Sequence, residues 1–314
     1  MKIAILDKST LGADIDLSAI KTLGETTEYP TTAPEEMPAH IGDADVIVVN
    51  KIKCNENTLK KTENLKLICV AATGYDNIDL EYCKSRNIGL CNVPGYSTNS
   101  VAQVSVAMAM SLATHITEYR NTVNSGKYTE SGVANCLVPV FHEMSSLAWG
   151  VVGGGGIGTK VAEIAGAIGC KVMVCRRKQE GNFPLADIDT ICRECDIISL
   201  HVPLSDSTRN IISRSRIESM KQGAIVINTA RGAVADEAAL ADAAKLGKIL
   251  LGCDVYSTEP FGKDHPFYKI KDLDNVLLTP HMAWGAYESR MRCVKIISEN
   301  IKCFFEGNAQ NRII

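Results

Sequence analysis

Residues 149–158 read Trp149-Gly-Val-Val-Gly-Gly-Gly-Gly-Ile-Gly158, an apolar segment that breaks into glycines. Gly153, Gly155 and Gly158 have the spacing G-x-G-x-x-G. In that pattern the first glycine permits a tight turn from strand to helix. The second lets a pyrophosphate approach the backbone, and the third lets helix and strand pack closely. The segment therefore predicts a strand, a phosphate-binding turn and the start of a helix.

The flanking residues extend this pattern to a βαβ unit. Residues 156–169 indicate a helix, and Lys171–Cys175 indicates a second apolar strand. The phosphates of a dinucleotide would lie at the N-terminus of that helix, where unpaired N–H groups and the positive end of the dipole favour anions. A purely structural glycine-rich turn is the alternative. Because the whole βαβ unit is present, we expect dinucleotide binding.

The second strand runs into basic residues where an acidic one is usual. In NAD-binding domains a carboxylate about 20 residues beyond the glycines hydrogen-bonds the adenine-ribose 2′-hydroxyl. This chain has Cys175-Arg176-Arg177-Lys178 there. Guanidinium groups suit bidentate recognition of phosphate, so we expect Arg176 and Arg177 to favour NADP(H). A solvated basic turn is the alternative, and it would leave NAD(H) as the cofactor.

The composition is that of an ordinary globular protein. Of 314 residues, 46% are apolar and 22% are charged, and the length suggests about two domains. The formal charge of −3 gives no electrostatic case for binding nucleic acid or an anionic membrane. The least polar long stretch, residues 101–113, contains glutamine and serine, which favours a buried helix over a bilayer span.

The twelve cysteines are scattered, and several lie inside apolar segments. This distribution suits buried, reduced thiols, and the first residues resemble a β-strand rather than a signal peptide, so we expect a cytoplasmic protein. Cys192 and Cys195 have the spacing of redox or zinc motifs, but no second pair of ligands accompanies them. We therefore expect two thiols of one helix and no metal site.

Apolar strands and helical segments alternate throughout, which predicts parallel sheets covered by helices. We expect an α/β fold with two open parallel-sheet domains and a cleft between them. A Rossmann dinucleotide-binding domain, residues 99–284, would be inserted into a flavodoxin-like substrate domain, residues 1–98 plus 285–314. The further strands expected are Lys2–Asp7, Asp45–Asn50, Lys66–Ala71, Gly89–Asn92, Ile197–Leu200, Ala224–Asn228, Leu250–Asp254 and Val276–Leu278. The further helices expected are Asp79–Arg86, Asp236–Lys245, Ala286–Phe305 and one capped by Asn99 or Ser100 that runs to Ala113, with a looser segment at 121–146.

Three polar residues follow predicted strands of the second domain, on the side where open α/β sheets bind ligands: Arg231, Glu259 and His281. An arginine can bind the carboxylate of a 2-keto acid and polarise its keto oxygen, and a histidine can give that oxygen a proton. A carboxylate can hold the imidazole in one tautomer and stabilise its protonated form. Each residue alone suits an ordinary structural role, so their joint placement carries the hypothesis. Among the other histidines, His201 is the one expected to line the cofactor cleft.

Motifs spread over the whole chain make it resemble the D-isomer-specific 2-hydroxyacid dehydrogenases. Besides the glycine motif they are Ala72-Thr-Gly-Tyr-Asp-Asn-Ile-Asp79, Gly95-Tyr-Ser-Thr-Asn-Ser-Val-Ala-Gln103, His201-Val-Pro-Leu204, Asn228-Thr-Ala-Arg-Gly232, Asp254-Val-Tyr-Ser-Thr-Glu-Pro260 and Pro280-His-Met-Ala-Trp284. The motifs at 95–103 and 280–284 are most similar to those of glycerate dehydrogenases, also called hydroxypyruvate reductases. Two positions depart from the family pattern: Arg176 replaces the acidic residue of NAD-using members, and Ser146-Leu147 stands where many relatives carry Gly-Lys.

The resemblance implies that Arg231 orients the substrate, Glu259 tunes the histidine and His281 donates the proton. The cofactor-binding residues expected, which include the glycines and the two arginines, are Thr73, Gly153, Gly155, Gly156, Ile157, Gly158, Arg176, Arg177, Val202, Pro203, Thr229, Ala230, Arg231, Asp254 and His281. The substrate-binding residues expected are Lys51, Gly74, Tyr75, Arg231 and Trp284.

The expected activity is hydride transfer between NAD(P)H and a small 2-keto acid, with hydroxypyruvate reduced to D-glycerate. Glyoxylate, pyruvate and phenylpyruvate are alternative substrates, because pocket size is not readable from one sequence. A non-catalytic dinucleotide sensor, like the corepressors that share this fold, is the alternative of a different class. The presence of all three proton-transfer residues argues against it. The resemblance also suggests a homodimer built around the nucleotide domain.

Overall fold

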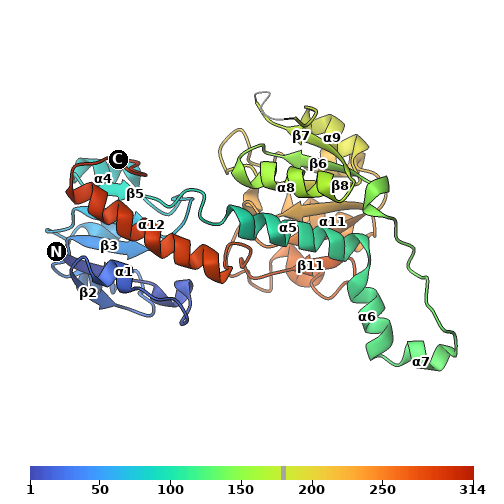
Figure 1. The fold of residues 1–314 in the computed structure, drawn as a ribbon, viewed down its shortest axis with the longest axis horizontal. Helices are drawn as coiled ribbons and strands as arrows, with labels where there is room; N and C mark the ends of the chain where they lie inside the picture. Colours follow the sequence, from blue (N-terminus) through green and yellow to red (C-terminus); the bar gives the residue numbers. More distant parts are fainter. Residues whose placement is uncertain (178–181) are drawn as a thin grey trace. The chain divides into compact units, whose positions relative to one another are not determined.

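The computed structural model describes residues 1–177 and 182–314, so Lys178 of the basic segment lies outside the described residues. The described chain divides into two compact units (Figure 1). Unit 1 comprises Met1–Ser97 and Trp284–Ile314, and unit 2 comprises Thr98–Ala283. Each unit contains one open parallel sheet, which confirms the expected fold class.

Unit 1 contains a five-stranded parallel sheet in the order β2-β1-β3-β4-β5, the flavodoxin-like order. Its strands are β1 (Lys2–Ile5), β2 (Glu25–Glu28), β3 (Val46–Val49), β4 (Leu67–Val70) and β5 (Gly89–Cys91). Two of its interior strands, β3 and β4, are entirely apolar and fully buried, because helices cover both faces of a parallel sheet.

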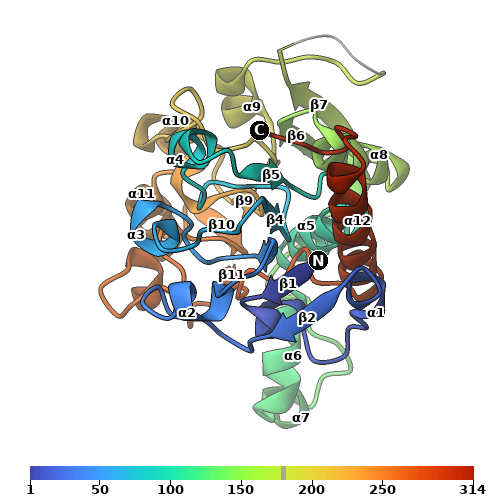
Figure 2. The same cartoon turned by 90° about the vertical axis from the view of Figure 1, so that its left-hand side faces the viewer.

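Two apolar clusters separate the faces of this sheet. One cluster joins it to α1 (Ser18–Lys21) and the long α12 (Tyr287–Phe305). The other joins the opposite face to α2 (Met37–Ile41), α3 (Glu56–Leu59) and α4 (Leu80–Ser85), as the view in Figure 2 shows. A short 3-10 helix, η1 (Lys8–Leu11), follows β1.

Unit 2 contains a six-stranded parallel sheet in the order β11-β10-β9-β8-β6-β7. From β6 the chain adds β7 at one edge and then returns to β8 on the other side of β6. This reversal is the switch point of a doubly wound sheet, where such folds bind ligands outside the carboxyl ends of the strands. The strands are β6 (Ala148–Val152), β7 (Lys171–Cys175), β8 (Ile197–Leu200), β9 (Ala224–Asn228), β10 (Ile249–Cys253) and β11 (Val276–Leu278).

Helices cover both faces of the unit 2 sheet. α5 (Thr98–Ala113) and α8 (Gly156–Ala167) share one apolar cluster with it, and α9 (Ile188–Glu194), α10 (Arg214–Ser219) and α11 (Glu237–Lys245) share the other. The short helices η3 (Gly232–Val234) and η4 (Pro266–Lys269) follow β9 and β10. Figure 1 shows α6 (Ile116–Asn124), α7 (Lys127–Ser131) and the chain after them projecting from the rest of this unit.

Several expected elements differ from the structure. α5 begins at Thr98, so neither Asn99 nor Ser100 caps it, and β10 begins and ends one residue earlier than expected. The segment 121–146, expected to be loose, contains the end of α6, all of α7 and the 3-10 turn η2 (Met144–Ser146). β2 was missed because its sequence Glu-Thr-Thr-Glu is polar, and half of its residues are exposed at the sheet edge.

The cysteines match the expectation of unpaired, mostly buried thiols. All twelve lie within the described residues and are free; nine are buried. Cys192 lies in α9 and Cys195 is the residue that ends this helix, and the described residues hold no cluster of three or more side chains suited to a metal ion. Among the helices described, none combines the length and apolar character needed to cross a bilayer.

Candidate active site

The glycine turn follows β6 at the switch point of unit 2. Gly153 has φ +107°, and a Cβ there would lie 2.7 Å from the carbonyl carbon of His201. A Cβ on Gly158 would lie 1.8 Å from the carbonyl oxygen of Gly153. Neither position can hold a side chain, so strand β6 and helix α8 approach each other as closely as the motif requires.

The N-terminus of α8 offers donors beside open space. The first hydrogen bond of the helix runs from the Thr159 N–H to the Gly155 carbonyl at 2.9 Å, so the N–H groups of Gly156, Ile157 and Gly158 have no partner within the helix. A Cβ on Gly155 would meet nothing within 4 Å. Donors beside open space at a helix N-terminus fit the pyrophosphate of a dinucleotide.

The residue after β7 lies against this turn. The side chain of Arg176 packs over Gly154, and its Nε and Nη2 atoms are buried without a hydrogen-bond partner among the described residues. Buried cationic donors without acceptors are costly. An anionic ligand would supply the missing acceptors. Arg177 is exposed.

His201 lies at the end of β8, on the other side of β6. Its N–H donates to the Val152 carbonyl at 2.7 Å, which places its backbone beside Gly153. Both ring nitrogens are buried without a partner in the described part of the chain. Burial lowers the pKa of His201 to about 3, so its imidazole is neutral at neutral pH.

The other expected cofactor residues of unit 2 lie beyond β8 and β9. Val202 and Pro203 follow His201, and Val202 packs against the cluster of α9–α11. Thr229 is buried, with its hydroxyl 2.8 Å from that of Ser105 on α5. The Ala230 N–H donates to the Asn228 side chain at 3.1 Å.

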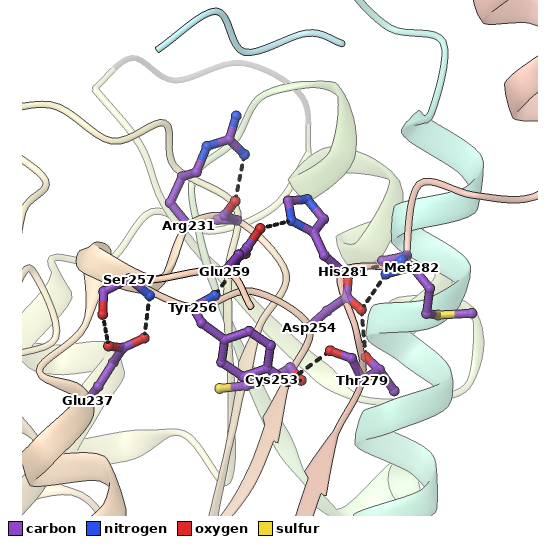
Figure 3. A network of polar contacts seen from close by, with 12 residues as sticks. Arg231, Glu237, Cys253, Asp254, Tyr256, Ser257, Glu259, Thr279, His281 and Met282 are labelled. Carbon is purple, nitrogen blue, oxygen red and sulfur yellow. Dashed lines mark hydrogen bonds and ion pairs between the residues drawn. The ribbon is translucent and has the colours of Figure 1, made fainter. Parts of the chain in front are cut away.

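Arg231, Glu259 and His281 follow three adjacent parallel strands, β9, β10 and β11. Figure 3 shows their side chains beyond the ends of these strands, with the Glu259 carboxylate directed at the His281 ring. Nδ1 of His281 lies 2.6 Å from Oε2 of Glu259. Their side chains are 21% and 28% exposed, so the pair is open enough to meet a ligand. The structure thus brings these two predicted residues into direct contact.

The other oxygen of Glu259 is held by the backbone. Oε1 accepts the Tyr256 N–H at 3.0 Å. Glu259 therefore has one oxygen fixed to its own loop and the other on the imidazole. This arrangement holds the ring in one orientation, with Nδ1 facing the carboxylate.

Buried Asp254 shapes the loop that carries His281. Its Oδ1 accepts the Thr279 hydroxyl at 2.6 Å and the Met282 N–H at 2.8 Å, and its Oδ2 accepts the Ala283 N–H at 2.9 Å (Figure 3). These contacts bracket His281, whose φ of +53° lies in the left-handed region. Asp254 therefore fixes a strained backbone turn that presents the imidazole.

Arg231 is placed by its own turn and by the loop after β10. Its Nη1 donates to the Ala230 carbonyl at 2.7 Å, and the Asn228 amide donates to the Arg231 carbonyl at 2.9 Å. A Cβ on the next residue, Gly232, would lie 2.1 Å from backbone atoms of Tyr256 and Ser257. This close approach joins the Arg231 turn to the loop that carries Glu259.

The expected residues of unit 1 gather at the carboxyl edge of its own sheet. Lys51 follows β3, and Thr73, Gly74 and Tyr75 follow the neighbouring β4. Lys51 is exposed, and the Thr73 hydroxyl donates to the Val93 carbonyl at 2.9 Å. Trp284 is partly buried in unit 1 and meets Tyr96 edge to face at 6.2 Å.

Sequence reasoning missed Asp7, which supports the Lys51 loop. Its carboxylate accepts the N–H groups of Asn50 at 3.0 Å and Lys51 at 2.9 Å. Burial raises the pKa of Asp7 above its usual value, and these backbone bonds offset only part of that rise. The available signal was an acidic residue at the end of the first apolar strand.

Comparison with known proteins identifies the family. Residues 106–283 match the model described as D-isomer specific 2-hydroxyacid dehydrogenase, NAD binding domain. The chain is 33% identical to the hydroxypyruvate reductase of Blautia hydrogenotrophica, over 99% of both chains. It belongs to the D-isomer-specific 2-hydroxyacid dehydrogenases.

A second relative and a solved structure are also similar to this chain. The glycerate dehydrogenase of Methylorubrum extorquens is 35% identical, over 99% of this chain and 98% of the relative. The structure of an acyclic imino acid reductase (Bsp5) in complex with NADPH and D-Arg superposes with a TM-score of 0.87 at 29% identity, with both chains fully covered. In this dehydrogenase, the match to the family model runs from within α5 to Ala283, which is most of unit 2. Unit 2 contains the glycine turn and the Glu259–His281 pair.

Proposed function

We propose that this dehydrogenase reduces a small 2-keto acid with NADPH, and that hydroxypyruvate, reduced to D-glycerate, is its substrate. The observation that carries the proposal is the hydrogen bond between His281 and Glu259 at the carboxyl edge of the unit that holds the glycine turn. Arg231 follows β9, the strand beside β10, and lies at the same edge of the sheet.

The N–H groups at the start of α8 and the open face of Gly155 would hold the pyrophosphate. The reduced nicotinamide supplies the hydride when bound. Arg231 binds the substrate carboxylate through its forked guanidinium and draws electron density from the keto oxygen. Nε2 of His281, opposite the nitrogen that faces Glu259, gives a proton to that oxygen. The negative charge of Glu259 stabilises the imidazolium before transfer and keeps the ring oriented.

The preference for NADPH is supported by Arg176. Arg176, Arg177 and Lys178 stand directly after β7, where a carboxylate would repel a 2′-phosphate. The Nε and Nη2 atoms of Arg176 are buried without acceptors among the described residues. NADH would leave these donors unpaired. The experiment is a comparison of kcat/KM with NADPH and NADH; a clear advantage for NADH would contradict the proposal.

Hydroxypyruvate is supported by two relatives, named a hydroxypyruvate reductase and a glycerate dehydrogenase, that align over nearly the whole chain. The test is a panel of hydroxypyruvate, glyoxylate, pyruvate and phenylpyruvate, with oxidation of NADPH as the readout. A higher kcat/KM for another acid would contradict hydroxypyruvate as the substrate and assign that acid instead. Binding of NADPH without turnover of any acid would favour a dinucleotide sensor.

The role of His281 has its own test. His281→Ala should lower kcat by on the order of 10²–10⁴, the usual contribution of general acid catalysis. His142→Ala is the control, because His142 is exposed and lies in a segment without catalytic candidates. Turnover of His281→Ala near that of the control would remove His281 from the mechanism.

We also propose a homodimer in a reducing compartment, the cytoplasm. The projecting segment of unit 2 exposes large apolar side chains: Ile116, Val123, Val133, Leu137, Val138, Val140 and Phe141. Apolar surface of this extent marks an association site, and a second copy of the chain is the partner that the family resemblance suggests. Leu137→Glu should therefore convert a dimer to monomers in sedimentation velocity; a parent protein that sediments as a monomer would refute the dimer.

A further inference from the structure

Residues 153–156 are four consecutive glycines, and the motif accounts for Gly153 and Gly155 but not for Gly154. The backbone of Gly154 lies outside the left-handed region, so its conformation would accept a side chain. The space above it is filled by another residue. A Cβ on Gly154 would lie 2.4 Å from Cδ of Arg176, 3.1 Å from its Cβ and 3.2 Å from its Cγ.

The stem of Arg176 therefore lies directly on the backbone of Gly154. An arginine usually extends its stem along apolar surface and keeps its guanidinium in water. Here Nε and Nη2 are buried at the turn without partners in the described chain. The peptide beneath them is fixed as well, because the Thr159 hydroxyl donates to the Gly154 carbonyl at 3.1 Å. The absence of a side chain at 154 is what lets the cation lie there.

We propose that Gly154 is a specificity-determining residue for the cofactor. Because it lacks a Cβ, it forms the seat for the Arg176 stem and thereby places the guanidinium where the 2′-phosphate of the adenine ribose binds. The inference rests on the proposed use of NADPH. It adds that the preference is set by a pair of residues, in which Gly154 positions Arg176 and Arg176 binds the phosphate.

The test is Gly154→Ala, with binding as the readout. A methyl group at 154 displaces the stem, so the guanidinium leaves the turn. The dissociation constants of NADPH and NADH are measured by fluorescence titration, and those of 2′,5′-ADP and 5′-AMP by calorimetry. Charge-assisted hydrogen bonds to phosphate are strong, so we expect a loss of about 10-fold or more for NADPH and 2′,5′-ADP. NADH and 5′-AMP should change by less than about 3-fold.

Two further variants show whether Gly154 acts through Arg176. Gly166→Ala, within helix α8, is the control, since its Cβ would meet Phe183 at an ordinary 3.5 Å. Arg176→Ala should by itself abolish the preference for the 2′-phosphate. Adding Gly154→Ala to Arg176→Ala should then change the NADPH affinity by less than about 2-fold, because coupled residues are not additive.

The outcomes separate the inference from the function on which it rests. If the parent protein binds 2′,5′-ADP no better than 5′-AMP, the assignment of NADPH fails. If the parent protein is selective and Gly154→Ala keeps that selectivity, the role of Gly154 is refuted while NADPH stands. Should Gly154→Ala fail to fold, the double variant decides. If the double variant folds, the contact between Gly154 and the Arg176 stem is supported. If the double variant also misfolds, the proposed role of Gly154 is refuted.

Discussion

The carboxylate of Glu259 connects the loop after β10 to the histidine after β11. One oxygen accepts the Tyr256 N–H at 3.0 Å, and the other lies 2.6 Å from Nδ1 of His281. The imidazole is therefore oriented by a group that is itself anchored to backbone. Such second partners fix the tautomer of a histidine as well as its position.

Glu259→Gln keeps the size of the side chain and removes its charge. The amide can still contact Nδ1, but it no longer stabilises the protonated ring. We expect kcat for keto-acid reduction to fall by about 10- to 100-fold, within the range of general acid catalysis. The measurement is a pH–rate profile from pH 5 to 9. Glu218→Gln, at an exposed residue of α10, is the control, and a profile shared by both variants would refute the pairing.

Asp254→Asn should disturb the turn that presents His281. Asp254 accepts three donors, the Thr279 hydroxyl and the N–H groups of Met282 and Ala283, whereas asparagine offers one acceptor oxygen. Unsatisfied buried groups cost about 1–3 kcal/mol each, so the free energy of unfolding should fall by that order and kcat should drop at least as strongly as in Glu259→Gln. Thermal melts and steady-state kinetics measure both. Asp242→Asn, at the surface of α11, should match the parent protein in each.

The positions of the candidate residues were predictable because topology determines them. Arg231, Glu259 and His281 each follow an apolar segment, and consecutive parallel strands end at one edge of a sheet. The structure orders those strands β9, β10 and β11 as neighbours. The glycines were likewise predictable, because their spacing reflects close contact between backbone segments. Gly153 lies against the backbone of His201, and Gly158 lies against the carbonyl oxygen of Gly153.

Other features depend on contacts that a single sequence does not encode locally. β2 has a polar sequence and pairs only at the edge of its sheet. α6 and α7 bury no residue within the chain, so no contact with the core of unit 2 fixes them as helices. The Arg176 stem lies in the space that a side chain at position 154 would fill, a contact between two residues far apart in sequence.

Gly232→Ala tests the contact between the Arg231 turn and the Glu259 loop. Its Cβ would lie 2.1 Å from backbone atoms that cannot rotate away. Overpacking of this kind costs about 1–3 kcal/mol, and the two loops must separate to relieve it. We expect reduced stability together with a loss of kcat/KM greater than that of Gly166→Ala, the matched control. Full activity in a variant of lowered stability would show that the two loops act independently.

The buried imidazole of His201 predicts a pH dependence of stability. Burial lowers the pKa of His201 in the folded protein to about 3, from an ordinary value of 6.5. Between these values the unfolded chain binds a proton that the folded chain does not, so the free energy of unfolding falls as pH decreases from about 6.5 toward 3. At neutral pH this imidazole costs little stability. Between pH 7 and pH 5 it lowers the free energy of unfolding by about 2 kcal/mol.

His201→Leu removes this titration, so the stability of the variant relative to the parent protein should rise by about 2 kcal/mol on going from pH 7 to pH 5. Urea unfolding measures it, with the fluorescence of Trp149, buried in β6, as the reporter in a Trp284→Phe background. His142→Leu, at an exposed residue, should leave the difference unchanged. If the stabilities of the His201 variant and the parent protein stay parallel across this range, the imidazole takes up its proton in the folded state and reaches water or an acceptor there.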